Sequence, residues 1–432
     1  MARVRPFKAY TYARSSADIT PLSAPPYDVI SEKERAKLLA KSATNVVALE
    51  LPEGPLDPTT SGNRYETGRK RWREWRDSGV VVRDRQPTLY VLEQRYELDG
   101  AEVRRRAIIG EVELHAFDEG VILPHERTLP KALGDRFNLT KACAANFSQV
   151  FGLFSDPARS TDRFFAEAMR RPVTMTATDA DGVVSDVWAV TDPAAIADLA
   201  RTLEHKQIFI ADGHHRYTTA LAYRDERRAT DAANGVSPVD PAYDFVMMAL
   251  VNMDDPGLVV LPTHRVADAP GTFDPAEFRS RLAEHFALAD ISPAEARAAL
   301  DAAEGPAFLM ATRGGDSPLL ATLRADIDLD SVIPLERSRA WKELDVAIVQ
   351  ELVLNPLLGI HPDRPETLDR LSFVKDTGEA LASVATHDVA LVLRATRMDQ
   401  MRAVALAGDM MPQKSTYFYP KLLSGLVMRA MD

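Results

Sequence analysis

The chain has 432 residues, of which 46% are hydrophobic and 27% charged, as in ordinary globular proteins, and this length favours two or three domains. Its net charge of −11 provides no general attraction to nucleic acid or to anionic membranes. The one cysteine, Cys143, excludes an intrachain disulfide and fits a reducing compartment. Alanines surround it, so we expect a buried and unreactive thiol.

Targeting signals are not apparent in the sequence. The N-terminal segment MARVRPFKAY lacks the hydrophobic region of a signal peptide, and no apolar run approaches the roughly 18 residues of a membrane span. We therefore expect a cytoplasmic protein without a membrane partner.

Helices and strands alternate along the first 266 residues. Ser31 and Glu34 form a capping box that begins a helix ending near Ser42, and Trp72 and Trp75 share one face of a helix over residues 65–78. The remaining predicted helices are residues 135–145, 161–170, 193–203 and 217–228, and the strands are residues 45–51, 146–154, 183–190, 207–210, 245–253 and 258–262.

Two strand pairings are expected from the turns between strands. Asp99 and Gly100 join residues 88–98 to residues 101–114 in the clearest hairpin of the chain, because Asp-Gly supplies the positive φ angles of a tight turn. Residues 245–253 and 258–262 are predicted to form a second pair.

The composition becomes richer in alanine and charge from about residue 267. Predicted helices are residues 275–286, 293–303, 345–358 and 397–408, and predicted strands are residues 307–310, 319–323 and 389–395. We expect an N-terminal catalytic domain over residues 1–266 and a C-terminal α/β domain over residues 267–432. The last segment, about 409–432, would return to the active-site cleft of the first domain.

A polar turn follows the strand predicted over residues 207–210. Asp212, Gly213, His214, His215 and Arg216 occupy five successive positions before a helix. A strand that turns through glycine into a helix leaves free backbone N–H groups and a positive dipole end, which together bind phosphate. A turn that merely carries polar residues is the alternative for an isolated Asp-Gly.

Two further clusters contain groups suited to catalysis. His125 and Glu126 lie within Pro124–Thr128, directly after an apolar run, where a carboxylate beside a histidine suits a general base. Taken alone, this cluster is more often a surface turn. Lys414, Ser415 and Thr416 offer one cation and two hydroxyls to an anion, although the aromatic residues that follow also fit a C-terminal strand.

Several well-known sites are not supported by the sequence. His214 and His215 are adjacent, so on a helix they point about 100° apart and cannot chelate one ion together. The sequence has no HExxH, GxxxxGK[ST], GxGxxG after a strand, or GxSxG. A zinc protease, a P-loop kinase, a Rossmann dehydrogenase and an α/β-hydrolase are therefore disfavoured.

The three clusters resemble motifs of the free L-serine kinases, which belong to the ParB/sulfiredoxin superfamily. Residues 208–221 resemble their strand-DGHHR-helix motif, Pro124-His125-Glu126 resembles the PHE segment with the catalytic glutamate, and Pro412–Thr416 resembles a late P-x-K-T-T segment. The motifs occur in the same order. As a whole, the chain also resembles the DUF1015 family of bacterial proteins.

The resemblance implies a mixed α/β (α+β) fold with a ParB/sulfiredoxin-like nucleotide-binding core, an insertion and a second α/β lobe. It implies a kinase that uses ATP or ADP, with Mg²⁺, to phosphorylate L-serine or a similar small hydroxy compound. Glu126 would be the base, His125 would orient the hydroxyl or the phosphate, and Asp212 would serve a ligand hydroxyl or the metal. The implied nucleotide- and phosphate-binding residues are Gly213, His214, His215 and Arg216, and the implied substrate-binding residues are Lys414, Ser415 and Thr416.

The chain departs from the kinase pattern in two respects. About 85 residues separate the glutamate motif from DGHHR, which requires an insertion. Ser415 replaces a threonine of the kinase motif, and Tyr417 and Phe418 replace the arginine and histidine that follow it in the kinases. These changes put the amino-acid specificity in question more than the phosphoryl transfer.

Other functions remain open at this stage. A ParB-like nucleotide-binding switch without kinase activity is the main alternative, although the net charge and the absence of a basic helix-turn-helix segment argue against DNA binding. Sulfiredoxin chemistry would need a cysteine where His214 stands. The expected partners are a nucleotide and a small substrate, with no nucleic acid, and a homodimer is one option for assembly.

Overall fold

The computed structural model describes residues 2–13, 18–126, 130–333 and 336–431. The chain divides into two compact units. Unit 1 contains residues 1–124, 128–259 and 420–432, and unit 2 contains residues 125–127 and 260–419. No helix of the described residues is long and apolar enough to cross a membrane.

Unit 1 is built on a nine-stranded mixed sheet in the order β6-β11-β8-β12-β5-β4-β10-β9, with β1 paired to β5. The β6–β11 and β8–β12 pairs are parallel, and the other pairs are antiparallel. The strands are β1 (Val4–Arg5), β4 (Leu89–Leu98), β5 (Ala101–Glu113), β6 (Ile122–Leu123), β8 (Val150–Phe154), β9 (Met175–Thr178), β10 (Val184–Val190), β11 (Ile208–Asp212) and β12 (Phe245–Asn252). Two small pairs accompany the sheet: β2 (Tyr10–Tyr12) with β3 (Val81–Arg83), and β7 (Ala145–Asn146) with β21 (Arg429–Ala430).

The predicted hairpin is confirmed. Strands β4 and β5 pair over their whole facing length, and Asp99 and Gly100 have φ angles of 52° and 77°. Positive φ at both central residues is the requirement of a type I′ turn, whose twist matches that of the strands.

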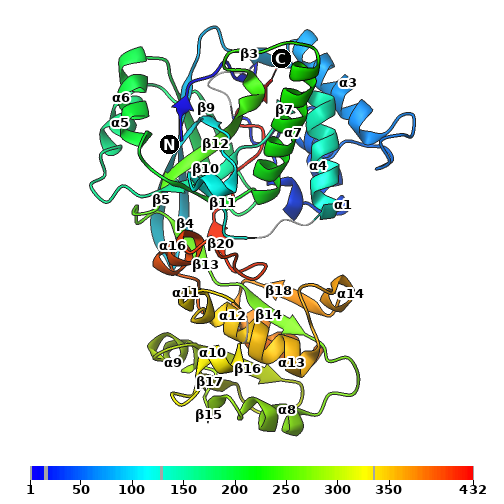
Figure 1. The fold of residues 1–432 in the computed structure, drawn as a ribbon, viewed down its shortest axis with the longest axis vertical. Helices are drawn as coiled ribbons and strands as arrows, with labels where there is room; N and C mark the ends of the chain where they lie inside the picture. The colour runs from blue at the N-terminus through cyan, green and yellow to red at the C-terminus, as the bar shows by residue number, and fades with distance from the viewer. Residues whose placement is uncertain (1, 14–17, 127–129, 334–335, 432) are drawn as a thin grey trace. The chain divides into compact units, whose positions relative to one another are not determined.

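The helices of unit 1 are α1 (Glu32–Lys41), α2 (Val47–Glu50), α3 (Arg64–Asp77), α4 (Pro130–Cys143), α5 (Asp162–Ala168), α6 (Pro193–Leu203) and α7 (His214–Ala233), with 3-10 turns η1 (Tyr27–Val29), η2 (Phe117–Glu119) and η3 (Ala242–Asp244). Helices α3, α4 and α7 pack side by side, whereas α5 and α6 lie at the other side of the sheet (Figure 1). The predicted capping box of Ser31 and Glu34 is present. Cys143 is buried, as predicted, and Trp72 and Trp75 are buried as well.

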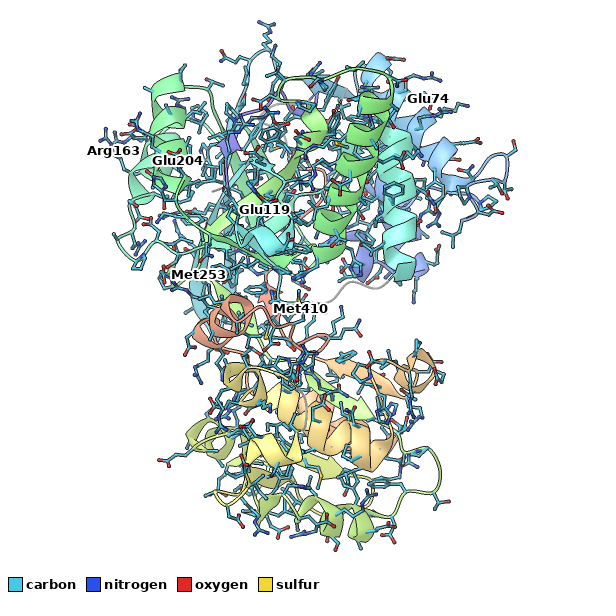
Figure 2. All side chains as sticks on the ribbon, in the orientation of Figure 1. Glu74, Glu119, Arg163, Glu204, Met253 and Met410 are labelled. Carbon is cyan, nitrogen blue, oxygen red and sulfur yellow. The ribbon has the colours of Figure 1, made fainter. Side chains whose placement is uncertain are left out.

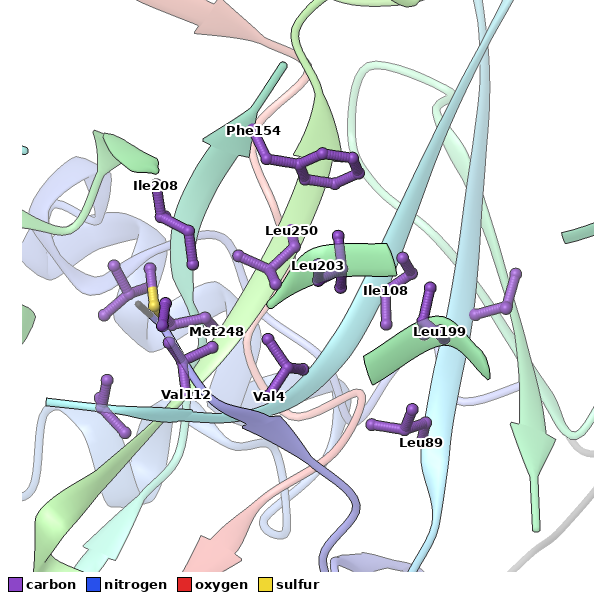
Figure 3. Close-up of a cluster of buried hydrophobic side chains, with 14 of the residues drawn as sticks. Val4, Leu89, Ile108, Val112, Phe154, Leu199, Leu203, Ile208, Met248 and Leu250 are labelled. Carbon is purple, nitrogen blue, oxygen red and sulfur yellow. The ribbon is translucent and has the colours of Figure 1, made fainter. Parts of the chain in front are cut away.

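The core of unit 1 lies against both faces of the sheet. Every residue of β12 is buried, as expected for a central strand covered on both sides. Figure 3 shows side chains from the strands, including Val4, Ile108 and Leu250, packed against Leu199 and Leu203 of α6. This packing gives the ends of the central strands a rigid support.

Unit 2 is built on a six-stranded antiparallel sheet in the order β15-β17-β16-β19-β14-β18. Its strands are β14 (His264–Ala267), β15 (Phe286–Asp290), β16 (Ala307–Thr312), β17 (Leu319–Leu323), β18 (Leu371–Val374) and β19 (Val389–Val392), and a separate pair joins β13 (Val259–Leu261) to β20 (Tyr417–Tyr419). Its helices are α8 (Pro275–Leu282), α9 (Ala296–Ala302), α10 (Leu329–Val332), α11 (Arg339–Lys342), α12 (Asp345–Val349), η4 (Gln350–Leu354), α13 (Asn355–Leu358), α14 (Pro365–Leu368), α15 (Thr377–Ala382), η5 (Ser383–Ala385) and α16 (Met398–Leu406).

Three local predictions differ from the structure. Residues 45–51 do not form a strand but contain helix α2, because the Asn45 side chain accepts the Val47 N–H at 2.9 Å and starts a helical turn. Residues 258–262 do not pair with β12, since β5 and β8 already occupy both its edges. The helix predicted over residues 345–358 is helical throughout, but its middle turn, η4, is a π-helix.

The predicted mixed α/β fold class is confirmed by the large mixed sheet and its helices. A ParB/sulfiredoxin-like core and the division into domains at residue 267 stay predictions.

Candidate functional site

The turn between β11 and α7 has the geometry of an anion site. Gly213 has a φ of 88° and precedes the first residue of α7, a helix of 20 residues. The Tyr217 N–H donates to the Gly213 carbonyl at 2.9 Å, and Gly213, as the N-cap residue, has no side chain to cap the helix. The first-turn N–H groups of a long helix and its dipole favour a negative charge at this point.

Gly213 is required for two reasons. Its positive φ costs little only for glycine. A Cβ atom at this position would also lie 2.9–3.0 Å from the guanidinium of Arg216. The turn therefore depends on glycine for both its backbone conformation and its space.

Arg216 points back under the turn. Its Nη1 donates to the Gln149 carbonyl, and its Nη2 lies 3.4 Å from Oδ2 of Asp212. The other oxygen of Asp212 lies 3.5 Å from Nζ of Lys421. Asp212 thus lies between two cations, and Arg216 helps to hold the turn together. His214 is buried and His215 is half-buried beside them.

Neither Gln149 nor Lys421 was predicted as a functional residue. Lys421 follows the late PQKST motif by only a few residues, so its charge near that motif was a usable signal. Gln149 contributes only its backbone carbonyl, which every residue has, so the sequence could not single it out.

A second cluster lies within unit 2 around His125 and Glu126. The His125 carbonyl accepts the Met411 N–H at 2.8 Å, and Glu126 forms a parallel β-bridge with Met411. Oε1 of Glu126 accepts the Lys414 N–H at 3.2 Å. Nε2 of the buried His125 lies 3.0 Å from Oγ1 of Thr416. The predicted base and the late motif are therefore brought together. Arg127 and Thr128, the rest of the His125 cluster, lie outside the described residues.

The late motif is a bent loop with different roles for its three residues. Lys414 has a φ of 57°, unusual for a residue with a side chain, and its side chain is exposed. Ser415 is buried, and its hydroxyl donates to the Pro412 carbonyl, so its observed contact is structural. The loop starts at Met410, which is labelled in Figure 2, and it is anchored there because the indole N–H of Trp341 donates to the Met410 carbonyl at 2.8 Å.

Arg265 is an additional residue at this cluster. Its guanidinium is buried and donates to the carbonyls of Thr263, Lys414 (3.1 Å) and Gln413 (3.3 Å). Burial lowers the pKa of Arg265 to about 9, and the Glu126 carboxylate acts in the opposite direction. Arg265 thus fixes the backbone of the bent loop and places a positive charge near Glu126. A polar triplet, Thr263 to Arg265, directly after an apolar strand was the available signal.

His264 has a structural role by contrast. Its Nδ1 accepts the Leu393 N–H at 3.2 Å, so the proton is on Nε2, which donates to Oγ1 of Thr377 at 3.1 Å. Burial lowers the pKa of His264 to about 4. The imidazole is therefore neutral, and both its nitrogens are used to join β14 to Leu393 after β19 and to Thr377 of α15.

A protein-only metal site is absent from the part of the chain that the structure describes, since no three His, Cys, Asp or Glu side chains there could hold one ion. Mg²⁺ is commonly held by one or two carboxylates together with substrate phosphates, and Asp212 is the carboxylate of the turn between β11 and α7.

The comparisons with known proteins give one family. The family described as "Protein of unknown function (DUF1015)" matches residues 4–347. No curated protein matches the sequence.

Several solved structures are similar at low identity. A mutant free serine kinase in complex with ADP is 12% identical, with a TM-score of 0.35, over 72% of this chain and 87% of that one. A free serine kinase in complex with AMP is 13% identical, with a TM-score of 0.34, over 72% of this chain and 86% of that one. A conserved hypothetical protein from Pyrococcus furiosus is 12% identical, with a TM-score of 0.34, over 73% of this chain and 92% of that one.

Proposed function

The chain belongs to the DUF1015 family, and we propose that this member is a kinase that transfers a phosphoryl group from ATP or ADP to the hydroxyl of free L-serine or a similar small hydroxy metabolite. With L-serine the product is O-phosphoserine.

The environment of Glu126 carries the proposal. Its carboxylate is oriented by the backbone N–H of Lys414, and the neighbouring residue His125 contacts the Thr416 hydroxyl. A general base must be an acceptor held in one orientation beside the proton that it removes. An oriented carboxylate next to an imidazole–hydroxyl pair suits deprotonation of an alcohol.

The turn between β11 and α7 supplies the second requirement, a place for phosphate. The helix N-terminus with His214, His215 and Arg216 would hold the phosphates of the nucleotide, and the exposed Lys414 side chain would bind the transferred phosphate or the substrate carboxylate. Bound Mg²⁺ would neutralise charge on the phosphates, with Asp212 as its carboxylate. Phosphoryl transfer needs mainly positioning and charge neutralisation from the protein.

The reaction requires both clusters to act on the same pair of substrates. Glu126 follows the end of β6 by three residues, and the phosphate-binding turn follows the end of β11. Strands β6 and β11 are parallel neighbours, and parallel strands present their carboxyl ends at the same edge of a sheet. Both strands therefore end at the same edge of the sheet of unit 1.

The direct test is an assay of the full chain with L-serine, Mg²⁺ and either ATP or ADP, in which O-phosphoserine is detected by phosphorus NMR. Failure with both nucleotides across a panel of small hydroxy metabolites would rule out the kinase. Nucleotide binding without any product would favour a nucleotide-gated switch instead.

The role of Glu126 is tested by Glu126→Gln, which keeps the shape and removes the base. We expect a loss of turnover of about 100-fold or more, with nucleotide affinity within a few-fold of the parent. The matched control is Glu204→Gln, at an exposed glutamate directly after α6, which should leave turnover unchanged. A fully active Glu126→Gln enzyme would remove the assigned base.

A further inference from the structure

A cavity of unit 1 is lined by helix α1, the segment before it, the turn after β9 and Leu423. Its volume is about 240 Å³, and Ala24, Val29, Ile30 and Leu38 contribute to its apolar lining. An apolar cavity of about 150 Å³ holds one benzene molecule, so this one has room for a six-carbon body and a small polar group. It is smaller than the roughly 300 Å³ at which pockets for drug-sized ligands begin, so it suits a ligand smaller than a nucleotide.

Hydrogen bonds join the segments that form the cavity and fix its walls. Ala24 and Ser424 exchange backbone hydrogen bonds of 2.8 and 3.3 Å. The Thr178 N–H donates to Oγ1 of Thr20 at 2.8 Å, which joins the turn after β9 to the segment before α1. The capping box of Ser31 fixes the start of α1. A cavity with fixed walls binds a ligand with little loss of conformational entropy.

Two carboxylates line the cavity, those of Glu34 and Asp179, and both already accept hydrogen bonds. Oε2 of Glu34 accepts the N–H and the hydroxyl of Ser31, each at 2.8 Å. Oδ1 of Asp179 accepts the N–H groups of Asp181 and Val183, each at 2.9 Å. Both carboxylates therefore serve the adjacent backbone.

The two lysines that line the cavity lack a close counter-ion. Lys37 and Lys41 are exposed and lie one turn apart on α1, and neither forms an ion pair with any residue that the structure describes. The hydrogen bonds from Ser31 are the main cause that lowers the pKa of Glu34, and the charge of Lys37 is the weakest one. Like charges four residues apart on a helix repel each other, and an anion that contacts both lysines would relieve this repulsion.

We propose that this cavity binds a small amphipathic carboxylate, with its carboxylate at Lys37 and Lys41 and an apolar body of about six carbons in the apolar lining. A lysine ammonium lies on a flexible stem, so it can reach an anion while its methylene groups stay against apolar surface. An uncharged ligand would leave the lysines without a counter-ion, and a cation would be repelled by them. No lining residue belongs to the two clusters of the candidate kinase site, so the proposal does not rest on the kinase activity.

Phenylacetate and hexanoate are the test ligands, because they combine a carboxylate with a ring or a chain of suitable size. Ligand-observed NMR titration of the full chain, without nucleotide, is expected to give a dissociation constant of about 1 mM or tighter for at least one of them. Phenylacetamide, which has the shape without the charge, and acetate, which has the charge alone, should bind about tenfold more weakly. No binding of either test ligand would overturn the proposal, and so would equal or tighter binding of the cation 2-phenylethylammonium.

A charge-matched pair of double variants tests the role of the lysines. Lys37→Gln with Lys41→Gln should weaken binding of the carboxylate about tenfold, since two exposed ion pairs are lost. The control is Lys8→Gln with Lys33→Gln, which removes the same charge at two exposed lysines that do not line the cavity and should leave the affinity within about twofold. Equal affinities of the two double variants would show that the lysines do not bind the carboxylate.

Two valines of nearly equal exposure test the apolar part of the cavity. Val29 is 43% exposed and lines the cavity, whereas Val82, on β3, is 44% exposed and does not. Val29→Asp removes apolar lining and adds a charge that repels the ligand, so binding should weaken at least about tenfold. Val82→Asp should change the affinity by less than about twofold. The same affinity in both variants would place the ligand outside this cavity and overturn the assignment.

Discussion

Replacement of Gly213 by alanine tests whether the contacts of Arg216 hold the turn between β11 and α7 together. Gly235, just after the other end of α7, is a control with a similar backbone, since its φ is 66° and a Cβ there would meet nothing within 4 Å. At Gly213, whose φ is 88°, the same Cβ would meet the Arg216 guanidinium at 2.9–3.0 Å. The two substitutions therefore share a backbone cost and differ in one contact.

The expected free energies follow from these two terms. Positive φ destabilises the folded state by about 1–2 kcal/mol for a residue with a Cβ. Alanine also lowers the entropy of the unfolded chain, which stabilises the protein by about 0.4–1 kcal/mol. Gly235→Ala should therefore lower the free energy of unfolding by about 1 kcal/mol. Gly213→Ala must also shift the Arg216 guanidinium, and loss of its charged hydrogen bond to the Gln149 carbonyl would add about 1.5–3 kcal/mol, for a total of about 2–4 kcal/mol.

Urea unfolding followed by tryptophan fluorescence measures both variants. Trp72, Trp75 and Trp188 lie in unit 1, so the signal reports mainly on that unit. Equal losses of stability, within about 0.5 kcal/mol, would refute the argument that Arg216 stabilises the turn.

Two further predictions rest on buried titratable groups. Burial raises the pKa of the Cys143 thiol to about 12, so a thiol reagent at pH 8 should label it only after unfolding, and rapid labelling of the folded protein would contradict its burial. The pKa of His264 is lowered from 6.5 to about 4, so between these pH values the unfolded state binds more protons than the folded state. The free energy of unfolding should therefore fall by about 3 kcal/mol as the pH decreases from 6.5 to 4. His264→Gln should flatten this slope in urea titrations at several pH values, and an unchanged slope would show that His264 is not its source.

Local patterns were sufficient where one short segment determines its own structure. The Asp99-Gly100 turn, the Ser31 capping box and Pro193 at the start of α6 were all predicted, because each depends on the φ preferences or hydrogen bonds of a few adjacent residues. The strand predicted over residues 45–51 was wrong because this segment also depends on contacts with distant residues. The Asn45 side chain binds the carbonyls of Pro21 and Ser23, and such distant partners are not visible in a local pattern.

The sequence alone determined the alternation of helices and strands and the residue types of both clusters, since these follow from hydrophobic periodicity and from polar residues placed after apolar runs. The fold class was what the family resemblance implied. Tertiary structure alone decided which of these groups meet. It joined Glu126 to the backbone of Lys414, buried Arg265 under that loop, and turned Arg216 inward to Gln149. It also placed Lys37 and Leu423 at one cavity. These contacts join residues distant in the chain, and many of them use backbone carbonyls, which every residue has and no sequence pattern distinguishes.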